Sequence, residues 1–418
     1  MIKKEVKIGK FKKRKTCRFC KSRKLIKFLD FGHMPHAGNY LKPKEVGKEY
    51  YYPLRIFFCK NCGLIQNLDI ISSETLFKNY HYLSSVSLTK HFQEYAKEVK
   101  KKFLNKNSFI VEIGSNDGVL LLPLSKMGFK VLGVDPAVNV GRIAKKKDLD
   151  IIVDYFGVKV ADNIVKKNGK ADLILANNVL AHIDDMNNVF KGIGKLLKDD
   201  GVLIFEVHYF PDLLKRLQYD FFYGEHLSYY NVSTLITFLN KYNLEIFDVK
   251  KMPIHSGSIR VYAKFKGNNR LKTKAGVLKL VKYEDDLDRV DEKILENFNL
   301  KIDKHRSDIK KLLMDIKKGG SRIVGYGAGG RANTFLCSCD VNNDLLDYIV
   351  DESPERQGKF TPGTHIPIVS PEIFRKDKVK YVLLLAWNYK KEIIKKEQAF
   401  AKNGGKFIVS FPKIHLVH

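Results

Sequence analysis

Long hydrophobic runs are absent from this sequence of 418 residues. No apolar stretch approaches the ~20 residues that a membrane-spanning helix needs, and the longest, such as YVLLLAW, have the length of buried strands. The lysine-rich start, MIKKEVKIGKFKKRK, lacks the apolar segment of a secretory signal. Internal repeats and low-complexity segments are also absent. We therefore expect a cytoplasmic protein of two or three folded domains, without a membrane partner.

Acidic side chains are scarce relative to basic ones. The 75 lysines and arginines exceed the 46 aspartates and glutamates, which gives a formal net charge of +29. Such a balance suits a polyanionic partner, either a nucleic acid or a nucleotide diphosphate. However, the lysines of EVKKKFLNKNS and KKEIIKKEQ fall between apolar positions, as they do on solvated helix faces. A lysine-rich surface is therefore the simpler interpretation, and we expect no nucleic-acid partner.

Cysteine is also rare, and four of the six cysteines form two pairs with the spacing of metal ligands. Two residues between thiolates let a tight turn aim both sulfurs at one tetrahedral ion, so the pairs predict a zinc site. Disulfides are the weaker alternative in a reducing cytoplasm. The insert between the pairs contains His33 and His36, which we interpret as structural or surface residues, and Cys337 and Cys339 as buried thiols. The predicted zinc ligands are Cys17, Cys20, Cys59 and Cys62.

Two blocks of the sequence alternate apolar strands with helical stretches, which predicts α/β domains whose sheets are covered by helices. The candidate strands of the first block are SFIVEIG, KVLGVDP, DIIVDYF, ADLILANNVL, GVLIFEVHY, LEIFDV and RVYAKFK. The second block is smaller, with about four strands: RIVGYGAGG, LDYIVDES, YVLLLAW and KFIVSFP. A charged amphipathic stretch between the blocks is typical of a helical linker. The expected divisions are 1–85 (zinc domain), 86–270 (first α/β domain), 271–318 (linker) and 319–418 (second α/β domain).

The stretch VEIGSNDG, residues 111–118, ends a strand with an acid and enters a glycine-bearing turn. Its glycine spacing differs from the GxGxxG that brings a pyrophosphate close to a helix N-terminus. Carboxylates facing such a loop suit a cationic ligand without phosphate, such as S-adenosylmethionine; an ordinary strand-to-helix turn is the alternative. Asp135 ends the next strand, where a carboxylate accepts hydrogen bonds from ribose hydroxyls. The expected cofactor contacts are Glu112, Gly114, Asn116, Asp117, Gly118, Asp135 and Asn177.

Several motifs run in order across nearly the whole chain. They are CRFC, FGHMPHAGNY and YYPLRIFFCKNCGLIQ, then YHYLSSVS, VEIGSNDG, NNVLAHI, YGEHLSYY and SGSIRVY, and finally GYGAGGRANTF and PGTHIPI. Together they resemble the sugar C-methyltransferases, which methylate a carbon of nucleotide-linked keto-deoxysugars. The resemblance implies a Rossmann-like S-adenosylmethionine-dependent methyltransferase domain, flanked by an N-terminal four-cysteine zinc-binding domain and a smaller C-terminal Rossmann-like α/β domain that helps to hold the sugar nucleotide. It implies S-adenosylmethionine and Zn²⁺ as cofactors, and we expect a monomer.

The resemblance also places an active site in YGEHLSYY, residues 223–230. The family's tyrosine, glutamate and histidine correspond to Tyr223, Glu225 and His226, whereas Gly224 departs from the histidine of many relatives. A carbon next to a ketone loses its proton to give an enolate, which requires a base of intermediate pKa and donors at the developing oxyanion. We therefore expect His226 to be the base and Glu225 to orient or tune it. A helical turn would place Tyr223 and His226 on one face, and an extended segment Tyr223 and Glu225.

Two more residues of the family's active site have counterparts here. A second histidine falls on His182, in NNVLAHI, and a further tyrosine falls on Tyr82, with Tyr80 as the alternative. By resemblance, these side chains position the substrate and stabilise the enolate. Taken without the resemblance, His182 is a helix-start residue, and the tyrosines cap the contact of the zinc domain with its neighbour.

A second glycine loop, Gly325-x-Gly327-x-x-Gly330, follows a strand of the C-terminal block, and Asp351 ends the next strand. This pattern matches the dinucleotide fingerprint and, at face value, predicts a nicotinamide site. The resemblance favours instead contact with the substrate's nucleotide or diphosphate, through backbone amides at a helix N-terminus. The expected substrate contacts are Tyr80, Gly327, Arg331, Asn333 and Lys359.

The sequence thus predicts an enzyme that removes the proton next to the keto group of a nucleotide-linked 4-keto-deoxysugar and methylates that carbon. The main alternative is a zinc-knuckle methyltransferase acting on RNA or DNA, whose basic residues should cluster with aromatic residues along one channel. The lysines are instead spread through all regions of the chain. A zinc-dependent assembly module without catalysis is the third interpretation.

Overall fold

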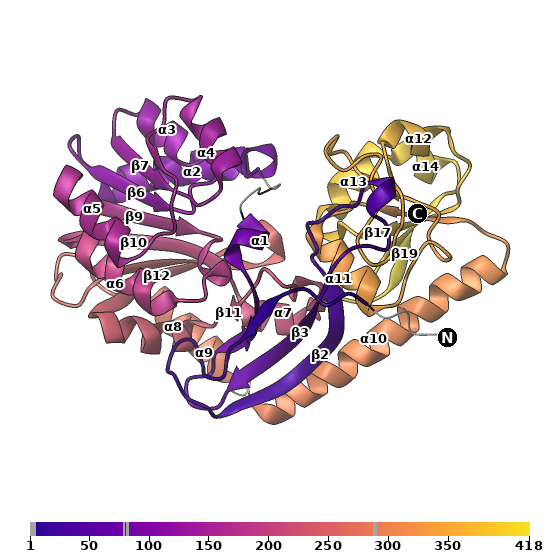
Figure 1. Ribbon diagram of the computed structural model, residues 1–418, viewed down its shortest axis with the longest axis horizontal. Coiled ribbons are helices and arrows are strands. Elements are labelled where there is room, and N and C mark those ends of the chain that lie inside the picture. The colour runs from indigo at the N-terminus through magenta and orange to yellow at the C-terminus, as the bar shows by residue number, and fades with distance from the viewer. Residues whose placement is uncertain (1–5, 78–79, 81–82, 287–290) are drawn as a thin grey trace.

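Three domains make up the computed structural model, which describes residues 6–77, 80, 83–286 and 291–418. Two α/β domains lie on either side of the molecule, and the N-terminal domain bridges them with the long β2–β3 ribbon (Figure 1). Within the described residues, no helix is both long enough and apolar enough to cross a membrane.

The N-terminal domain is built on an antiparallel sheet with the strand order β11-β4-β3-β2. These strands are β2 (Leu25–Pro35), β3 (Tyr51–Cys59), β4 (Ile65–Asn67) and β11 (Ser228–Tyr229). A separate pair consists of β1 (Phe11–Lys13) and β5 (Asp69–Ile71), and α1 (Ser73–Phe77) follows it. Because β11 comes from the middle of the chain, this sheet is shared between the N-terminal domain and the middle domain.

The middle domain is a seven-stranded sheet with the order β12-β13-β10-β9-β6-β7-β8. Its strands are β6 (Phe109–Ile113), β7 (Lys130–Val134), β8 (Ile151–Ile152), β9 (Ala171–Asn177), β10 (Leu197–His208), β12 (Leu244–Met252) and β13 (Ser258–Phe265). All seven segments predicted as strands lie in this one sheet. Strands β6 to β10 are parallel, and the order reverses between β6 and β9. Ligands of such sheets bind at this reversal, beyond the carboxyl ends of the strands.

Helices cover the middle sheet and connect its strands. They are α2 (Ser85–Phe103), α3 (Leu121–Lys126), α4 (Val138–Lys145), α5 (Val158–Asn168), α6 (Met186–Leu196), α7 (Phe210–Lys215) and α8 (Val232–Leu239). Strand β6 is buried along its whole length, as expected for a parallel strand covered on both faces.

The C-terminal domain is a six-stranded sheet with the order β16-β15-β14-β17-β18-β19. Its strands are β14 (Ile323–Tyr326), β15 (Ile349–Val350), β16 (Ile368–Val369), β17 (Tyr381–Leu384), β18 (Lys406–Val409) and β19 (His415–Val417). The prediction of about four strands was therefore wrong, because β16 and β19 have two and three residues and show no usable alternation. The helices are α11 (Gly330–Ser338), α12 (Pro371–Lys376), α13 (Lys390–Lys396) and α14 (Gln398–Lys402).

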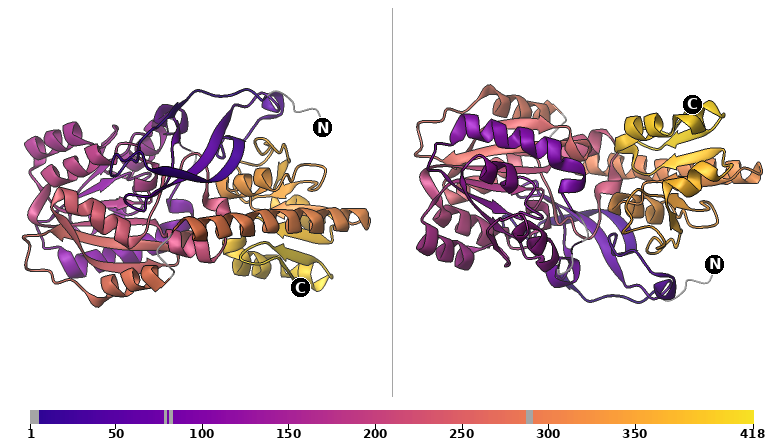
Figure 2. Two further views of the ribbon diagram at one scale, coloured as in Figure 1. Left: turned by 90° about the horizontal axis from the view of Figure 1, so that it is seen from below. Right: turned by 90° about the horizontal axis from the view of Figure 1, so that it is seen from above.

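Two helices connect the α/β domains, α9 (Ala275–Asp286) and the long α10 (Glu292–Lys318). Buried apolar residues of α10 recur at helical spacing: Leu295, Phe298, Ile302, Ile309 and Leu313. They belong to one apolar cluster with residues of β2 and of the C-terminal sheet. Figure 2 shows α10 running along the molecule from the middle domain to beneath the C-terminal domain. This helix therefore packs against two domains.

Candidate active site

The four predicted metal ligands meet in one cluster, in which the four Sγ atoms all lie within 4.8 Å of one another. Cys17 Sγ is 3.6 Å from Cys62 Sγ, and Cys20 Sγ is 3.5 Å from Cys59 Sγ, so the thiols are close but not joined as disulfides. Four thiols at this spacing fit a tetrahedral Zn²⁺ site. No other group of His, Cys, Asp or Glu in the described part of the chain has such a geometry.

The cofactor loop, residues 114–118, lies at the carboxyl end of β6, next to the reversal of strand order. Gly114 has φ +70° and Gly118 has φ +76°, which glycine adopts without strain. A Cβ on Gly118 would lie 2.2 Å from Leu149 Cδ1, so this turn has no room for a side chain. The backbone N–H of Ser84, at the start of α2, donates to Asn116 Oδ1 at 3.1 Å. The loop is therefore bordered by α2.

Buried carboxyl groups line this loop. Asn177 Nδ2 donates to Glu112 Oε1 at 3.3 Å, while Glu112 Oε2 and Asn177 Oδ1 have no hydrogen-bond partner among the described residues. Burial raises the pKa of Glu112 to about 8. Unpartnered acceptors at a buried site cost free energy unless a donor arrives. These atoms therefore fit a cationic ligand that also donates hydrogen bonds.

The two other acids of the cofactor set are engaged with the protein. Asp135 accepts hydrogen bonds from the backbone N–H groups of Asn116 and Ala137, both at 2.9 Å. Asp117 forms an ion pair with Lys147 at 3.3 Å. Asp135 therefore braces the cofactor loop, and each of its oxygens keeps one free lone pair.

The segment 223–226 forms a turn, which decides between the two geometries considered above. His226 N donates to Tyr223 O at 3.0 Å, as in a helical turn. The Nδ1–H of His226 donates to Phe221 O at 3.1 Å, so Nε2 carries the lone pair and accepts from the Tyr223 hydroxyl at 2.9 Å. Tyr223 and His226 therefore face each other, and Glu225 points elsewhere. A Cβ on Gly224 would lie 2.9 Å from Ile71 Cδ1, so a larger residue here would require the end of the Ile71 side chain to move.

Glu225 binds a histidine of the N-terminal domain. His36 Nε2 donates to Glu225 Oε1 at 3.0 Å. Burial alone would raise the pKa of Glu225, but the hydrogen bond and charge of His36 hold it below its usual value. The interpretation of His36 as structural or surface missed this contact, whereas His33 is exposed. His36 lies in FGHMPHAG, a motif of the resemblance, which was the available signal.

Two further histidines contact His226, and a third lies behind one of them. The ring centroid of His182 lies 5.0 Å from that of His226, and His182 Nδ1 donates to Glu225 O at 3.1 Å. His208 Nε2 lies 3.3 Å from His226 Nε2, and the His255 ring lies 5.8 Å from the His208 ring. Burial lowers the pKa of all four imidazoles, that of His255 to about 4. The site is therefore lined by neutral imidazoles that can accept a proton.

His208 and His255 were missed at the sequence level. His208 ends β10, at the same sheet edge as Asn177 at the end of β9, and this position was the available signal. Of the two tyrosine candidates, Tyr82 lies outside the described residues. Tyr80 lies beside α4, where its backbone N–H and C=O bond Asn139 at 3.1 and 2.8 Å.

The second glycine loop lies at the start of α11. Gly327 has φ +94°, and a Cβ there would lie 2.3 Å from Ala386 Cβ. Asp351 accepts from the backbone N–H of Ala328 at 2.7 Å and pairs with Arg356 at 3.1 Å. The acid of the dinucleotide fingerprint is therefore bonded to an arginine that the sequence did not single out.

The other predicted substrate contacts lie near this loop but differ in their surroundings. Asn333 is buried, and its Oδ1 has no partner among the described residues. Lys359 is partly buried, and its backbone N–H donates to Arg356 O at 3.1 Å. Arg331 pairs with Asp220 at 2.8 Å. Asn333 is the side chain of this group best prepared for a ligand.

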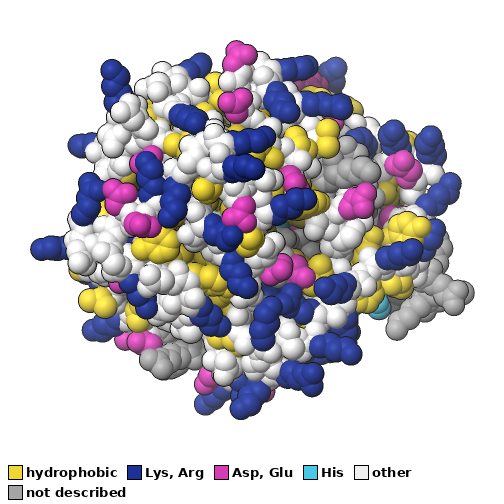
Figure 3. Space-filling model, turned by 60° about the vertical axis from the view of Figure 1, so that its left-hand side comes forward, with side chains coloured by type: hydrophobic (Ala, Val, Ile, Leu, Met, Phe, Trp, Pro, Cys, Tyr) yellow, Lys and Arg dark blue, Asp and Glu magenta, His cyan; other side chains and the backbone are white. Residues whose placement is uncertain are grey.

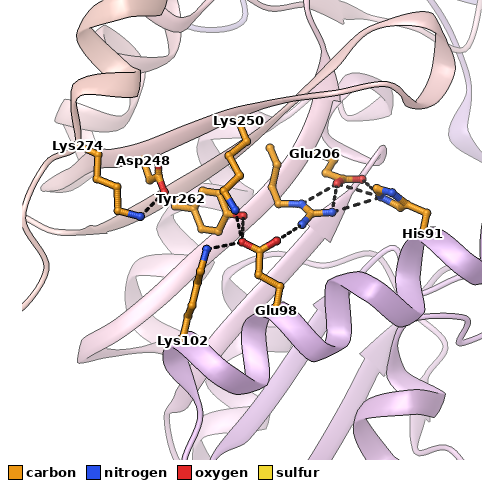
Figure 4. A network of polar contacts seen from close by, with 9 residues as sticks. His91, Glu98, Lys102, Glu206, Asp248, Lys250, Tyr262 and Lys274 are labelled. Carbon is orange, nitrogen blue, oxygen red and sulfur yellow. Dashed lines mark hydrogen bonds and ion pairs between the residues drawn. The ribbon is translucent and has the colours of Figure 1, made fainter.

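A network of charged side chains fastens α2 to the middle sheet, as Figure 4 shows. Arg260, in β13, donates to Glu206 of β10 at 2.7 Å and to Glu98 of α2 at 3.0 Å. His91 of α2 also donates to Glu206, at 3.0 Å. Arg260 and Glu206 are buried. The helix that borders the cofactor loop is thus held by ionic contacts to two strands.

Comparison with known proteins covers nearly the whole chain. Residues 17–77 match a family described as a zinc binding domain, residues 88–249 a methyltransferase domain, and residues 253–412 a C-methyltransferase C-terminal domain. C-methyltransferase NovU of Streptomyces niveus is 32% identical over 405 residues, which cover 96% of this chain and 96% of that protein. The ubiquinone biosynthesis O-methyltransferase of Bartonella quintana (strain Toulouse) is 33% identical over 99 residues, or 23% of this chain and 40% of that enzyme.

Among solved structures, an S-adenosylmethionine-dependent methyltransferase from Clostridium acetobutylicum is 19% identical, with a TM-score of 0.35, and covers 43% of this chain and 92% of that one. The family matches confirm the expected S-adenosylmethionine-dependent methyltransferase fold of the middle domain. They also confirm, with the four-cysteine cluster, the expected zinc-binding domain. Since one relative matches along nearly the whole length of both chains, this chain belongs to the family of C-methyltransferases that includes NovU.

Proposed function

We propose that this C-methyltransferase acts on a nucleotide-linked 4-keto-deoxysugar, from which it removes the proton next to the keto group before that carbon is methylated. The hydrogen-bonded pair of Tyr223 and His226, at 2.9 Å, is the observation that carries the proposal. It joins a neutral base to a phenol, the two groups that enolate formation requires.

The middle domain supplies the methyl donor site. S-adenosylmethionine, when bound, supplies an electrophilic methyl group on a sulfonium. Glu112 and Asn177 offer buried, unpartnered oxygens to its cationic groups, and Asp135 offers free lone pairs to ribose hydroxyls. The tight glycine turns of the cofactor loop let the backbone approach the ligand closely.

His226 is the proposed base. It is kept neutral by burial, and Phe221 O fixes the proton on Nδ1, so that Nε2 presents a lone pair. The substrate carbon takes the place of the Tyr223 hydroxyl at Nε2, and the hydroxyl then donates to the enolate oxygen. Glu225 and His182 hold the segment in this geometry, because His182 bonds the Glu225 carbonyl.

The C-terminal domain is proposed to hold the nucleotide. Gly327 opens a turn in front of α11, whose N-terminal amides can bind a diphosphate. Asn333 is buried with a free oxygen in the first turn of α11, and Lys359 is partly buried beside β16, where its carbonyl accepts from the backbone N–H of Ile368 at 2.8 Å.

Incubation with S-adenosylmethionine and a panel of nucleotide-linked 4-keto sugars tests the proposal, with product mass as the readout. We expect one sugar to gain a single methyl group. In deuterated water, the His226→Asn variant should exchange the alpha proton more slowly by a factor on the order of 10²–10⁴. His33→Asn, at an exposed histidine, is the control. Native exchange in His226→Asn would show that another group is the base.

A nucleic-acid methyltransferase was the main alternative. In Figure 3, lysine and arginine side chains are scattered over the whole face shown, with acidic side chains among them. A nucleic-acid groove would gather basic side chains along one path. The basic side chains on the face shown follow no such path, which favours a small-molecule substrate.

A further inference from the structure

Residues 219–230, which contain the proposed catalytic side chains, contact all three domains. Two arginines, one from each flanking domain, bond this 219–230 segment directly beside the residues that set the geometry of His226. Arg331 comes from α11 of the C-terminal domain, and Arg18 lies inside the first cysteine pair of the zinc domain. The inference drawn from them rests on the proposed function of His226.

Arg331 holds the early part of the segment. Its guanidinium pairs with Asp220 Oδ2 at 2.8 Å. The guanidinium carbon lies 3.8 Å from the centroid of the Phe221 ring and 4.8 Å from that of the Trp387 ring. Trp387 Nε1 donates to the same oxygen of Asp220 at 2.9 Å, and Asp220 is buried. The next residue, Phe221, provides the carbonyl that accepts from His226 Nδ1. Arg331 thus orients the acceptor that selects the His226 tautomer.

Arg18 holds the later part of the segment. It is fully buried, its Nη1 donates to the carbonyl of Leu227, and its Nη2 donates to Asn67 O at 2.9 Å. The Leu227 carbonyl also accepts from the backbone N–H of Asn67 at 3.1 Å, and Leu227 directly follows His226.

The zinc domain surrounds this arginine with further contacts. Phe19, the residue after Arg18, stacks on Phe238 of α8 with 3.7 Å between the ring centroids. Immediately beyond Leu227, β11 pairs with β4. A buried charge is costly unless its partners are fixed, so the position of Arg18 ties the Leu227 carbonyl to the cysteine cluster.

We infer that Arg18 and Arg331 are positioning residues, through which the zinc domain and the C-terminal domain together hold the 219–230 segment with the lone pair of His226 on Nε2. Both flanking domains are then part of the catalytic apparatus, and not solely sites for metal and substrate. The middle domain alone would bind its cofactor without orienting its base.

The test reads the His226 tautomer directly, without substrate. Full-length, zinc-loaded protein labelled with ¹⁵N-histidine gives the tautomer from long-range ¹H–¹⁵N correlations, and His226→Asn identifies the signal. We expect a pure Nδ1–H tautomer in the native protein and a tautomer mixture in Arg331→Gln and Arg18→Met. Arg306→Gln is the matched control, because Arg306 bonds Ser338 O, outside the segment.

Two further measurements separate positioning from general instability. S-adenosylmethionine affinity, measured by calorimetry, should be unchanged in Arg331→Gln, while alpha-proton exchange in the substrate falls by a factor on the order of 10² with KM unchanged. If Arg18→Met does not fold, Trp387→Phe removes one bond to Asp220 and should also disturb the tautomer. An unaltered His226 tautomer in both Arg331→Gln and Trp387→Phe would overturn the inference. Because this readout needs no turnover, it remains decisive even if the proposed substrate is wrong.

Discussion

At the scale of single residues, the site depends on ionisable groups whose pKa is moved by burial. Neutral imidazoles line the proposed substrate side, and a carboxyl group that is protonated at neutral pH lines the cofactor side. Such shifts suit a base that must start uncharged and an acid that becomes charged when its cationic partner binds.

Glu112 gives a pH dependence to cofactor binding. Its pKa of about 8 means that most of it is protonated at neutral pH in the free protein. A cationic ligand favours the ionised form, so binding should release a proton, and affinity should rise with pH and level off above about pH 8. Calorimetry in buffers of different ionisation enthalpy measures the released proton. The Glu112→Gln variant should bind without proton release; equal release in both proteins would exclude Glu112 as the group that titrates.

The residues of this site were predictable to different degrees. Tyr223, Glu225 and His226 stand together in one motif and could be found from the sequence. For His36 and His208 the sequence held only an indirect signal, the FGHMPHAG motif and the end of β10, and for His255 it held none, because each reaches the site only through the tertiary arrangement of the sheets. The turn at Tyr223 was left open at the sequence level because Gly224 is compatible with either backbone geometry.

At the scale of secondary-structure elements, the buried ionic network of α2 is the contact most sensitive to mutation. Replacing Arg260 by methionine leaves buried Glu206 without its cationic partner, which should lower the free energy of unfolding by about 3–5 kcal/mol. Lys102→Met, at the exposed end of the network, should lower the free energy of unfolding by less than about 1 kcal/mol. Urea unfolding of both variants checks this difference. Equal, small losses would mean that α2 is held by apolar packing alone.

The same network predicts loss of stability in acid. Burial acts to raise the pKa of Glu98, but hydrogen bonds from Lys102 and Lys250 lower it to about 2, and His91 and Arg260 lower that of Glu206. A carboxyl group with a lowered folded pKa stabilises the fold above its unfolded pKa, about 4.3, and this contribution disappears as pH falls through the folded value. The urea concentration at the unfolding midpoint should therefore decrease as the pH is lowered from about 4.3 to about 2. Glu98→Gln should show a shallower fall; an identical pH profile would contradict the assignment.

Long elements were predictable and short ones were not. The seven strands of the middle sheet are long or flanked by clear helices, so their alternation is visible in the sequence. Strands β11 and β16 have two residues each, and β11 exists only because β4 of another domain lies beside it. Such strands form through tertiary pairing, and the local sequence pattern does not predict them.

At the scale of the whole molecule, the three domains are interlocked. Cys17 and Cys59 belong to the same apolar cluster as the core of the middle sheet, and β2 shares a second cluster with α10 and the C-terminal sheet. The sequence indicated the existence of these domains through cysteine spacing and alternation. It did not indicate that the N-terminal sheet would incorporate a strand of the active-site segment.

This interlocking predicts the effect of zinc removal. Metal-thiolate contacts contribute directly to folding, and the cysteine cluster packs into the core of the middle domain. Chelation should therefore lower Tm for the N-terminal and middle domains together, and added zinc should restore it. Cys337→Ser, outside the cluster, should retain its zinc content. A middle domain that melts at the same temperature with and without zinc would show that the domains are independent.

The central claim is methyl transfer to a carbon whose proton has been removed by the Tyr223 and His226 pair. Its most direct test uses the substrate identified from the keto-sugar panel, deuterated at the carbons next to the ketone, with mass spectrometry of the methylated product. The account predicts that every product molecule gains one methyl group and loses at least one deuterium, and that His226→Asn slows both changes together. A methylated product that retains all its deuterium would mean transfer to oxygen and would contradict the account.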